Sequence, residues 1–472
     1  MFDVANKTVL VLGLDAHGRA AAELLLQRGS RVVAFDTAVD RDSMEPIAAL
    51  RASGAEVLPG TSPVPSGDFA LAVLSPSLSA GDPLIEEVSR RHIPLVGELE
   101  LGFGVAQCLS IGIAGTNGKS TTAEMIARML AASHRKAVVA GHAEQPACAI
   151  AARAKDLDFV IFQTTASQLE YTNYFRPAVA VLLNLAPVRL EGYATAEQYI
   201  RANARLFRNQ QIFDWAIIQS EALLRLRELD LPVPAKIVTF SATDTTADLY
   251  LDRGLLISRL ENWPGPLLDM DHCQVRGPHN AENLMAALAV GRALRLPLEN
   301  MADPLKTYSA GAHRCELVAE INGVQFINDA NAGNVDALHK ALLAARPAPG
   351  GQPNVWLIAG GRDDSSDFHY LGPTLSKRVK RAFLLGESAE KIRAAWSLFT
   401  PCTVSRTLVE AVWEAAKSAG SGDVVLFSPA CSSLEEFRSC QLAGERFCAA
   451  VKSISSGASA EHPNRHGESV PF

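Results

Sequence analysis

The amino-acid sequence alternates short apolar runs with longer stretches in which apolar residues recur at helical spacing. The short runs predict buried strands, and the spaced stretches predict helices. The expected strands are residues 8–12, 31–35, 69–74, 94–96, 108–114, 137–140, 159–162, 178–183, 215–219, 237–240, 324–327, 355–358, 381–385 and 424–427. The expected helices include residues 122–132, 196–207, 282–293, 334–345, 388–395, 407–416 and 433–453. This alternation is typical of largely parallel sheets that are covered by helices on both faces.

The chain of 472 residues is too long for one hydrophobic core, and the expected elements group into three α/β blocks. Residues 1–100 form a Rossmann-like block, residues 101–300 a central block with a parallel sheet, and residues 301–455 a second Rossmann-like block. Residues 456–472 are small and polar, and we expect them to be disordered. The predicted fold is therefore α/β with three domains.

A glycine-rich turn lies between an expected strand and an expected helix, with the sequence Gly115-Thr116-Asn117-Gly118-Lys119-Ser120-Thr121. A strand that leads through such a turn into a helix directs backbone N–H groups and the positive helix end at one anion. Lys119 is suited to neutralise phosphate charge, and the hydroxyl of Ser120 or Thr121 to reach Mg²⁺. The loop is a variant, because Ile113 stands where the strict motif has glycine. A plain strand-to-helix turn is the alternative, but it gives the Lys–Ser pair no purpose.

A second turn, Gly13-Leu-Asp-Ala-His-Gly18, follows the first expected strand, and Asp36 ends the second strand. This layout is typical of dinucleotide-binding folds, in which the acidic residue contacts a ribose hydroxyl. Asp15, however, occupies the position of the glycine that lets a pyrophosphate approach, and its charge repels phosphate. Plain packing and a related, non-dinucleotide use are both left open. A nicotinamide-dependent dehydrogenase is disfavoured, because it rests on this segment alone.

The composition, with 48% hydrophobic and 20% charged residues, is that of an ordinary globular protein. The net charge of −7, without a block of Lys or Arg, argues against nucleic acid or an anionic membrane as the main partner. No apolar run reaches transmembrane length, and the N-terminus lacks a signal-peptide layout, so we expect a cytoplasmic protein. The eight cysteines include no CxxC pair, and we expect reduced core thiols.

Further motifs occur in a fixed order along the chain. They are Gln168-Leu-Glu170 before Arg176-Pro-Ala-Val-Ala180, Gly277-Pro-His-Asn-Ala-Glu-Asn283, His313-Arg-Cys-Glu316, Ile327-Asn-Asp329, Ala359-Gly-Gly361 and Ser428-Pro-Ala-Cys-Ser-Ser-Leu434. Together with the phosphate loop, they resemble the ATP-dependent Mur ligases over residues 9–447, most closely the branch that adds D-glutamate (MurD type). Several motifs in one order are much more specific than a single loop.

The resemblance implies a ligase that joins D-glutamate to UDP-N-acetylmuramoyl-L-alanine through an acyl phosphate in peptidoglycan precursor synthesis. It implies a first domain of UDP-sugar-binding type, a central ATP-binding domain and a C-terminal Mur ligase domain. The implied partners are small molecules, namely ATP, a UDP-sugar-peptide and an amino acid, with Mg²⁺ as a further cofactor.

The resemblance also assigns roles to single residues. Gly115 to Thr121 match the family's phosphate loop, with Lys119 as the catalytic residue. Asn283 matches an adenine-side Asn, Arg314 a phosphate-side Arg and Asp329 a ribose-side Asp. The expected substrate-side residues are Leu14, Asp15, Asp36, Ser75 and Ser433.

Several metal positions of the family are substituted in this chain. Gln163 replaces a Glu that ligates Mg²⁺, Arg189 a metal-binding His, and Asn203 a carbamylated Lys. A carboxamide keeps an oxygen donor but lacks the charge that a hard divalent cation favours, and the arginine cation repels it. Ser120 is left as the candidate metal ligand.

Positions on the acceptor side are substituted as well. Asn331 and Gly333 replace the Lys and Thr that hold the incoming glutamate, Asp364 replaces a further Lys, and His142 replaces an Asn. Two functions therefore stay open at this point: a working ligase of the MurD type, and a degenerate relative that binds ATP without ligating. The degenerate relative would act as a regulator or as the partner of a second Mur ligase.

Overall fold

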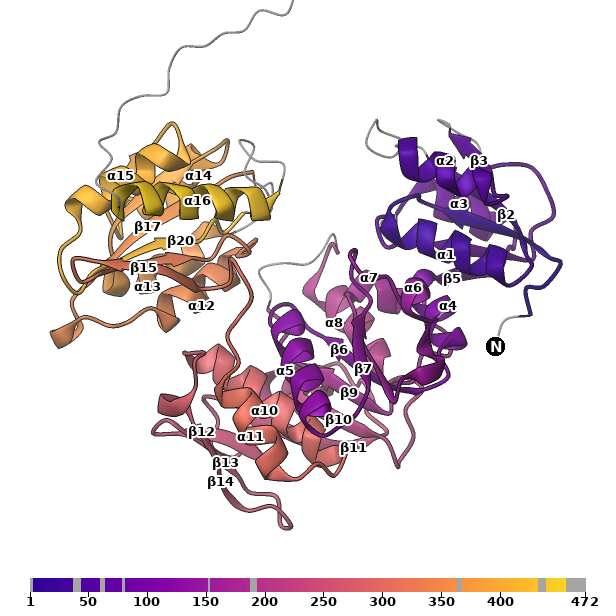
Figure 1. The fold of residues 1–472 in the computed structure, drawn as a ribbon, viewed down its shortest axis with the longest axis horizontal. Coiled ribbons are helices and arrows are strands. Elements are labelled where there is room, and N and C mark those ends of the chain that lie inside the picture. Colours follow the sequence, from indigo (N-terminus) through magenta and orange to yellow (C-terminus); the bar gives the residue numbers. More distant parts are fainter. Residues whose placement is uncertain are drawn as a thin grey trace, which may run out of the picture. The chain divides into compact units, whose positions relative to one another are not determined.

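The computed structural model describes residues 3–36, 44–59, 64–78, 81–151, 153–186, 193–362, 367–431 and 439–455. The chain divides into two compact units, Met1–Ser309 and Ala310–Phe472. The described elements form three sheets, of which the first unit holds two and the second holds one (Figure 1). Helices pack on the faces of each sheet, so the expected α/β class is correct. The expected boundaries at residues 100 and 300 stay predictions.

The first sheet is parallel and has the order β3-β2-β1-β4-β5. Its strands are β1 (Thr8–Leu12), β2 (Arg31–Asp36), β3 (Glu56–Pro59), β4 (Leu71–Leu74) and β5 (Leu95–Gly97). The helices α1 (Ala16–Gln27), α2 (Met44–Ala52) and α3 (Pro83–Arg90) connect them. Alternate residues of β1 enter separate apolar clusters, with Val9 and Val11 in one and Leu10 and Leu12 in the other. Both faces of this sheet are therefore covered, as expected of a parallel sheet.

The second sheet has nine strands in the order β14-β13-β12-β11-β10-β9-β6-β8-β7. The parallel strands are β6 (Leu109–Ala114), β7 (Ala137–Ala140), β8 (Phe159–Gln163), β9 (Val179–Leu182), β10 (Trp215–Gln219), β11 (Lys236–Ser241) and β12 (Leu249–Asp252). The helices are α4 (Glu98–Val105), α5 (Lys119–Ala132), α6 (Ala147–Ala151), α7 (Ala166–Glu170), α8 (Ala196–Ala204), α9 (Ser220–Glu228), α10 (Pro278–Ala293) and α11 (Leu298–Lys306). The expected helix at 122–132 therefore begins earlier, at Lys119.

An antiparallel extension of this sheet was not expected from the sequence. Strands β13 (Leu255–Ser258) and β14 (Gly265–Asp269) pair antiparallel, and β13 pairs antiparallel with β12. A two-residue turn, Arg253 and Gly254, joins β12 to β13 with positive φ at both positions. Strands β12 and β13 are only half buried and end in Asp252 and Ser258, so their apolar runs are shorter than those of the inner strands.

The second unit contains a six-stranded sheet in the order β15-β16-β20-β17-β18-β19. Its strands are β15 (Glu316–Ile321), β16 (Val324–Asn328), β17 (Val355–Gly360), β18 (Val379–Leu385), β19 (Cys402–Val404) and β20 (Val424–Phe427). Its helices are α12 (Val335–Ala344), α13 (Gly372–Arg378), α14 (Ala389–Trp396), α15 (Leu408–Ser418) and α16 (Cys440–Ser455). Among the strands described in this unit, only β15, at the edge, runs antiparallel to its neighbour. The expected helix at 433–453 is described from Cys440 onwards, and the tail at 456–472 lies outside the described residues.

A buried pair of ionisable side chains connects α1 of the first sheet to α4 and α6. Nδ1 of His17 lies 3.2 Å from Oε2 of Glu98, and Oε1 of Glu98 accepts from the backbone N–H of Cys148 over 2.6 Å. All three side chains are buried. Burial alone lowers the pKa of His17, but the hydrogen bond and charge of Glu98 outweigh it and raise that pKa. Helices α1, α4 and α6 are thereby held together.

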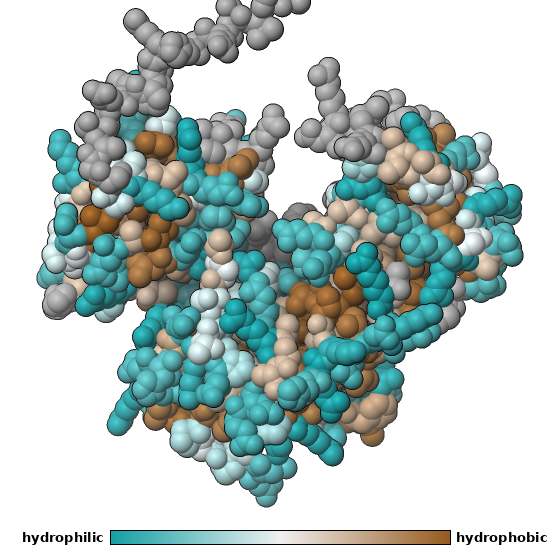
Figure 2. Space-filling view, in the orientation of Figure 1, coloured by the Kyte–Doolittle hydropathy of each residue, from teal (hydrophilic) through white to brown (hydrophobic). Residues whose placement is uncertain are grey.

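The surface is mixed in character, and the cysteines are all thiols. The visible face carries mainly hydrophilic residues with smaller hydrophobic areas between them (Figure 2). None of the helices in the described part of the chain is long and apolar enough to cross a membrane. All eight cysteines are free thiols, as expected, but Cys440 is exposed and so is not a core thiol.

Candidate nucleotide and substrate sites

The phosphate loop lies between the end of β6 and the start of α5, in a conformation that requires glycine. Gly115 has φ +128° and Gly118 has φ +93°. A Cβ on Gly118 would lie 2.4 Å from Oδ1 of Asn283, which is on α10. The side-chain hydroxyl of Thr122 also donates to this Asn283 oxygen, over 3.3 Å. The structure therefore brings the expected Asn283 against the loop.

Asn184 supports the loop from the neighbouring strand and was missed in the sequence. Its backbone oxygen accepts from the N–H of Thr116 over 2.9 Å, and its Oδ1 accepts from the N–H of Asn117 over 3.0 Å. Its Nδ2 donates to the Asn117 carbonyl over 2.8 Å. The sequence does offer a signal for this role of Asn184, which is a polar residue two positions after the end of β9. Strand β9 pairs with β6, the strand that leads into the loop.

The loop suits a polyphosphate. Lys119 folds over it, with Nζ donating to the carbonyl of Gly115 over 2.5 Å and to that of Thr116 over 3.4 Å. The ammonium, the N-terminus of the 14-residue helix α5 and the loop amides are thus gathered at one place. Such a cradle favours a bound anion, since the helix end carries partial positive charge. Thr116 is anchored below it by a hydrogen bond of 3.0 Å to Tyr199 Oη.

The candidate metal side of this loop consists of neutral groups. Oγ of Ser120 donates to Oε1 of Gln163 over 2.8 Å. Asn203 is buried and donates through Nδ2 to the carbonyl of Tyr199 in its own helix, over 2.9 Å. Arg189 lies outside the described residues. Ser120 therefore suits a cation that accompanies phosphate, but Gln163 and Asn203 bring no negative charge to hold one.

The second unit contains the other two expected nucleotide residues, Arg314 and Asp329. Asp329 is buried, and its carboxylate accepts from Oγ of Ser428 over 2.9 Å and from the N–H of Cys315 over 3.1 Å. Burial raises the pKa of Asp329 to about 7, although both hydrogen bonds oppose that rise. His313 and Cys315 have positive φ, so Asp329 holds an unusual loop that carries Arg314. A ribose contact by Asp329 stays a prediction.

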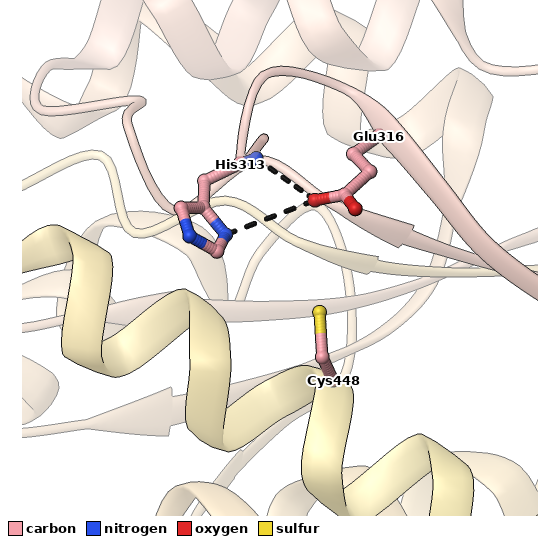
Figure 3. Close-up of side chains that lie close together, drawn as sticks. All are labelled: His313, Glu316 and Cys448. Atoms are coloured by element: carbon pink, nitrogen blue, oxygen red, sulfur yellow. Dashed lines mark hydrogen bonds and ion pairs between the residues drawn. The ribbon is translucent and has the colours of Figure 1, made fainter. Parts of the chain in front are cut away.

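His313, Glu316 and Cys448 form a group whose ligand atoms lie within 4.8 Å of one another (Figure 3). Their arrangement does not favour a metal. Nδ2 of Asn328 donates to Nδ1 of His313 over 2.8 Å and also contacts Sγ of Cys448 at 3.2 Å. Asn328 therefore occupies one ring nitrogen of His313 and contacts the sulfur of Cys448, and the group connects α16 to the loop at Arg314. Gly444 permits α16 to pack this closely on His313, because a Cβ at residue 444 would lie 2.2 Å from Nδ1 of His313.

The structure describes three of the four substituted acceptor-side positions. Asn331 donates to the carbonyl of Ala312 over 3.4 Å and accepts from the thiol of Cys440 over 3.1 Å. His142 begins the turn after β7, where it bridges to Gln145. Gly333 precedes α12, and Asp364 lies outside the described residues. At Asn331, where the family has a Lys, the described structure thus has a neutral side chain.

The expected substrate-side residues of the first sheet meet at the carboxyl ends of its strands. The backbone N–H of Leu14 donates to Oδ2 of Asp36 over 2.6 Å. Gly13 lies close to Ser75, because a Cβ added to Gly13 would be 2.8 Å from the Cβ of Ser75. The strand order reverses between β1 and β4, and ligands of open α/β sheets bind at such a reversal. Ser433 lies outside the described residues.

Asp15 changes what this turn can bind. Its Oδ1 accepts from the N–H groups of His17 over 2.9 Å and Gly18 over 3.0 Å, so it caps α1. An anion at a helix N-terminus would use those same donors. The interpretation that Asp15 opposes a pyrophosphate at this turn is therefore supported by the geometry.

Two family models and many relatives match this chain. Residues 113–291 match the model of the Mur ligase middle domain, and residues 313–431 match the Mur ligase, glutamate ligase domain. A UDP-N-acetylmuramoylalanine–D-glutamate ligase of Geobacillus kaustophilus is 34% identical, with 95% of this chain and 98% of that protein covered. A ligase of the same name from Acidobacterium capsulatum is 32% identical, with 94% and 96% covered.

Solved structures support the fold. The MurF ligase of Thermotoga maritima in complex with ADP matches with a TM-score of 0.62 and 15% identity, over 96% of this chain and 100% of that one. The MurC ligase of the same organism matches with a TM-score of 0.59 and 18% identity, over 96% and 99%. On the strength of relatives above 30% identity over nearly its whole length, this chain belongs to the Mur ligase family.

Proposed function

We propose that this protein is an ATP-dependent ligase that joins D-glutamate to UDP-N-acetylmuramoyl-L-alanine in the cytoplasmic synthesis of peptidoglycan precursors. The observation that carries the proposal is the phosphate cradle at the start of α5, within a chain whose full-length relatives bear the name of this ligase. The names of these relatives do not favour a degenerate, non-ligating protein.

The chain's own residues are assigned separate tasks in this proposal. Lys119 and the loop amides bind the ATP phosphates, and the Lys119 ammonium offsets negative charge as phosphate is transferred. We assign the adenine contact to Asn283, which lies beside the loop, and Ser120 would offer an oxygen to the cation of the nucleotide. The reversal point of the first sheet, at Leu14, Asp36 and Ser75, holds the UDP-sugar portion.

The experiment that tests the proposal identifies the product. The purified protein is incubated with ATP, Mg²⁺, UDP-N-acetylmuramoyl-L-alanine and an equimolar mixture of D-glutamate and L-glutamate carrying different isotopes. Mass spectrometry should find the D-glutamyl product and ADP, and neither with the Lys119→Ala variant. Bound ATP without any glutamyl product would contradict the proposal and would favour the degenerate relative.

A further inference from the structure

Gln163 lies beside the phosphate loop and holds its serine. It is the last residue of β8, where it pairs with Ile113 in β6, the strand that leads into the loop. Its side chain is about nine-tenths buried, and its Oε1 accepts from Oγ of Ser120 over 2.8 Å. A hydroxyl that donates its proton in this way keeps its lone pairs available to a cation. The pair can therefore offer oxygen atoms to a metal, but no charge.

The second position at which the family has an anionic group is also a carboxamide here, and it is hydrogen-bonded within its own helix. Asn203 is buried and donates to the backbone carbonyl of Tyr199, one turn earlier in α8. Tyr199 in turn contacts Oγ1 of Thr116 through its hydroxyl. Asn203 therefore supports the helix that anchors the loop. The family resembled by the sequence has anionic groups at both positions, and the neutral side chains of Gln163 and Asn203 do not supply them.

Charge decides how a divalent cation is held at such a site. Mg²⁺ is bound in proteins through one or two carboxylates together with substrate phosphates, because neutral oxygens alone compensate poorly for its lost hydration. Gln163 and Asn203 are neutral, so the phosphates of ATP bring to Ser120 the negative charge that these two side chains do not supply. A cation then gains affinity when the nucleotide is present.

We propose that this site takes up a divalent cation only together with ATP, as a single ion held by the phosphates and Ser120, and that Gln163 is a positioning residue for Ser120. The proposal rests on the ATP-binding part of the proposed function and does not require ligation. In this proposal the ligand of the site is the complex of the nucleotide with one metal ion. It takes the place of a metal centre that the protein would hold independently.

The test measures Mn²⁺ binding to the full-length protein by electron paramagnetic resonance, with and without a non-hydrolysable ATP analogue. The wild-type protein should bind Mn²⁺ only with the analogue, in a ratio of one to one. Gln163→Glu adds a charge in nearly the same shape and should bind Mn²⁺ about tenfold or more tightly than wild type without nucleotide. The matched control is Gln211→Glu, which alters an exposed carboxamide of the same unit and should behave as wild type.

Several outcomes would overturn the proposal. These are Mn²⁺ binding by the wild-type protein without nucleotide, two ions per analogue, or equal Mn²⁺ affinities of Gln163→Glu and Gln211→Glu. Ser120→Ala provides an independent variant that should lose Mn²⁺ affinity in the presence of the analogue while retaining analogue binding in EDTA. If the protein gives these binding results but does not form the glutamyl product, only the proposed function is contradicted. If the protein does not bind the analogue at all, both the proposed function and this proposal are overturned.

Discussion

The hydroxyl of Ser120, in the first turn of α5, donates a 2.8 Å hydrogen bond to Oε1 of Gln163 at the end of β8. This bond connects the phosphate loop to the neighbouring strand of the central sheet. It places a neutral carboxamide where the family resemblance leads one to expect a metal-binding carboxylate. A cation at this site therefore depends on the charge of the bound nucleotide, as we propose above.

Replacing Lys119 by Ala should abolish ATP binding while leaving the fold intact. The ammonium is the cation that folds over the loop, and a charged donor facing phosphate contributes more than a neutral one. Isothermal titration calorimetry with ATP measures the loss. Lys136→Ala, an exposed lysine of the same unit, is the control and should bind like the wild type. Unchanged affinity in Lys119→Ala would show that the loop is only structural.

Replacing Gly118 by Ala should destabilise the first unit and weaken ATP binding. The positive φ costs about 1–2 kcal/mol for alanine, and the new methyl group would meet Oδ1 of Asn283 at 2.4 Å. Gly254→Ala isolates the backbone contribution, because Gly254 has φ +85° and no heavy atom within 4 Å of the added Cβ. Thermal unfolding and ATP titration of both variants provide the comparison. Equal losses in both would mean that contact between the loop and Asn283 is unimportant.

The candidate site was partly predictable from the sequence. The phosphate loop follows from a local motif, and Asn283 from a second motif within one helix. Asn184 was missed because its role depends on which strand lies next to β6, which a local pattern does not specify. The burial of Asp329 was likewise not predictable, since its partners Cys315 and Ser428 are 14 and 99 residues away.

The fold shows the same division between local and long-range information. Buried strands such as β1, β10 and β20 coincide with their apolar runs, because they are covered on both faces. The half-exposed strands β12 and β13 were missed, although the Arg253-Gly254 turn between them was a usable signal.

Asp329 should make the second unit less stable as pH rises. Its pKa of about 7 lies above the ordinary value of 3.8, so the folded state holds the proton more tightly than the unfolded chain. The unfolding free energy contributed by this group is therefore highest in acid and is lost as pH rises from about 4 to about 7. Asp329→Asn should remove this dependence.

Hydrogen exchange in β16 and β20, corrected for intrinsic rates, measures the effect of Asp329 within the second unit itself. Protection in the wild type should fall across that pH range more than protection in the variant. Asp367→Asn, which changes a carboxylate that caps a short helix in the same unit, is the control and should retain the wild-type slope. Parallel pH profiles of Asp329→Asn and the wild type would contradict the assignment.

Breaking the buried pair of His17 and Glu98 should lower the unfolding free energy of the first unit strongly. Removing one partner leaves the other charge buried, which typically costs about 3–5 kcal/mol. His17→Ala should therefore lower the unfolding free energy of the first unit by that order. His272→Ala, which removes an exposed histidine 3.5 Å from Asp269, should cost less than about 1 kcal/mol. Chemical denaturation measures both, and equal effects would show that the pair does not hold α1 to α4.

The most direct test of the central claim is phosphate release measured with ATP, Mg²⁺, UDP-N-acetylmuramoyl-L-alanine and D-glutamate. An ATP-dependent D-glutamate ligase should release phosphate only when both substrates are present, and the release should disappear in the Lys119→Ala variant. If ATP binds and no phosphate is released with both substrates, the protein is not this ligase, and the account is contradicted.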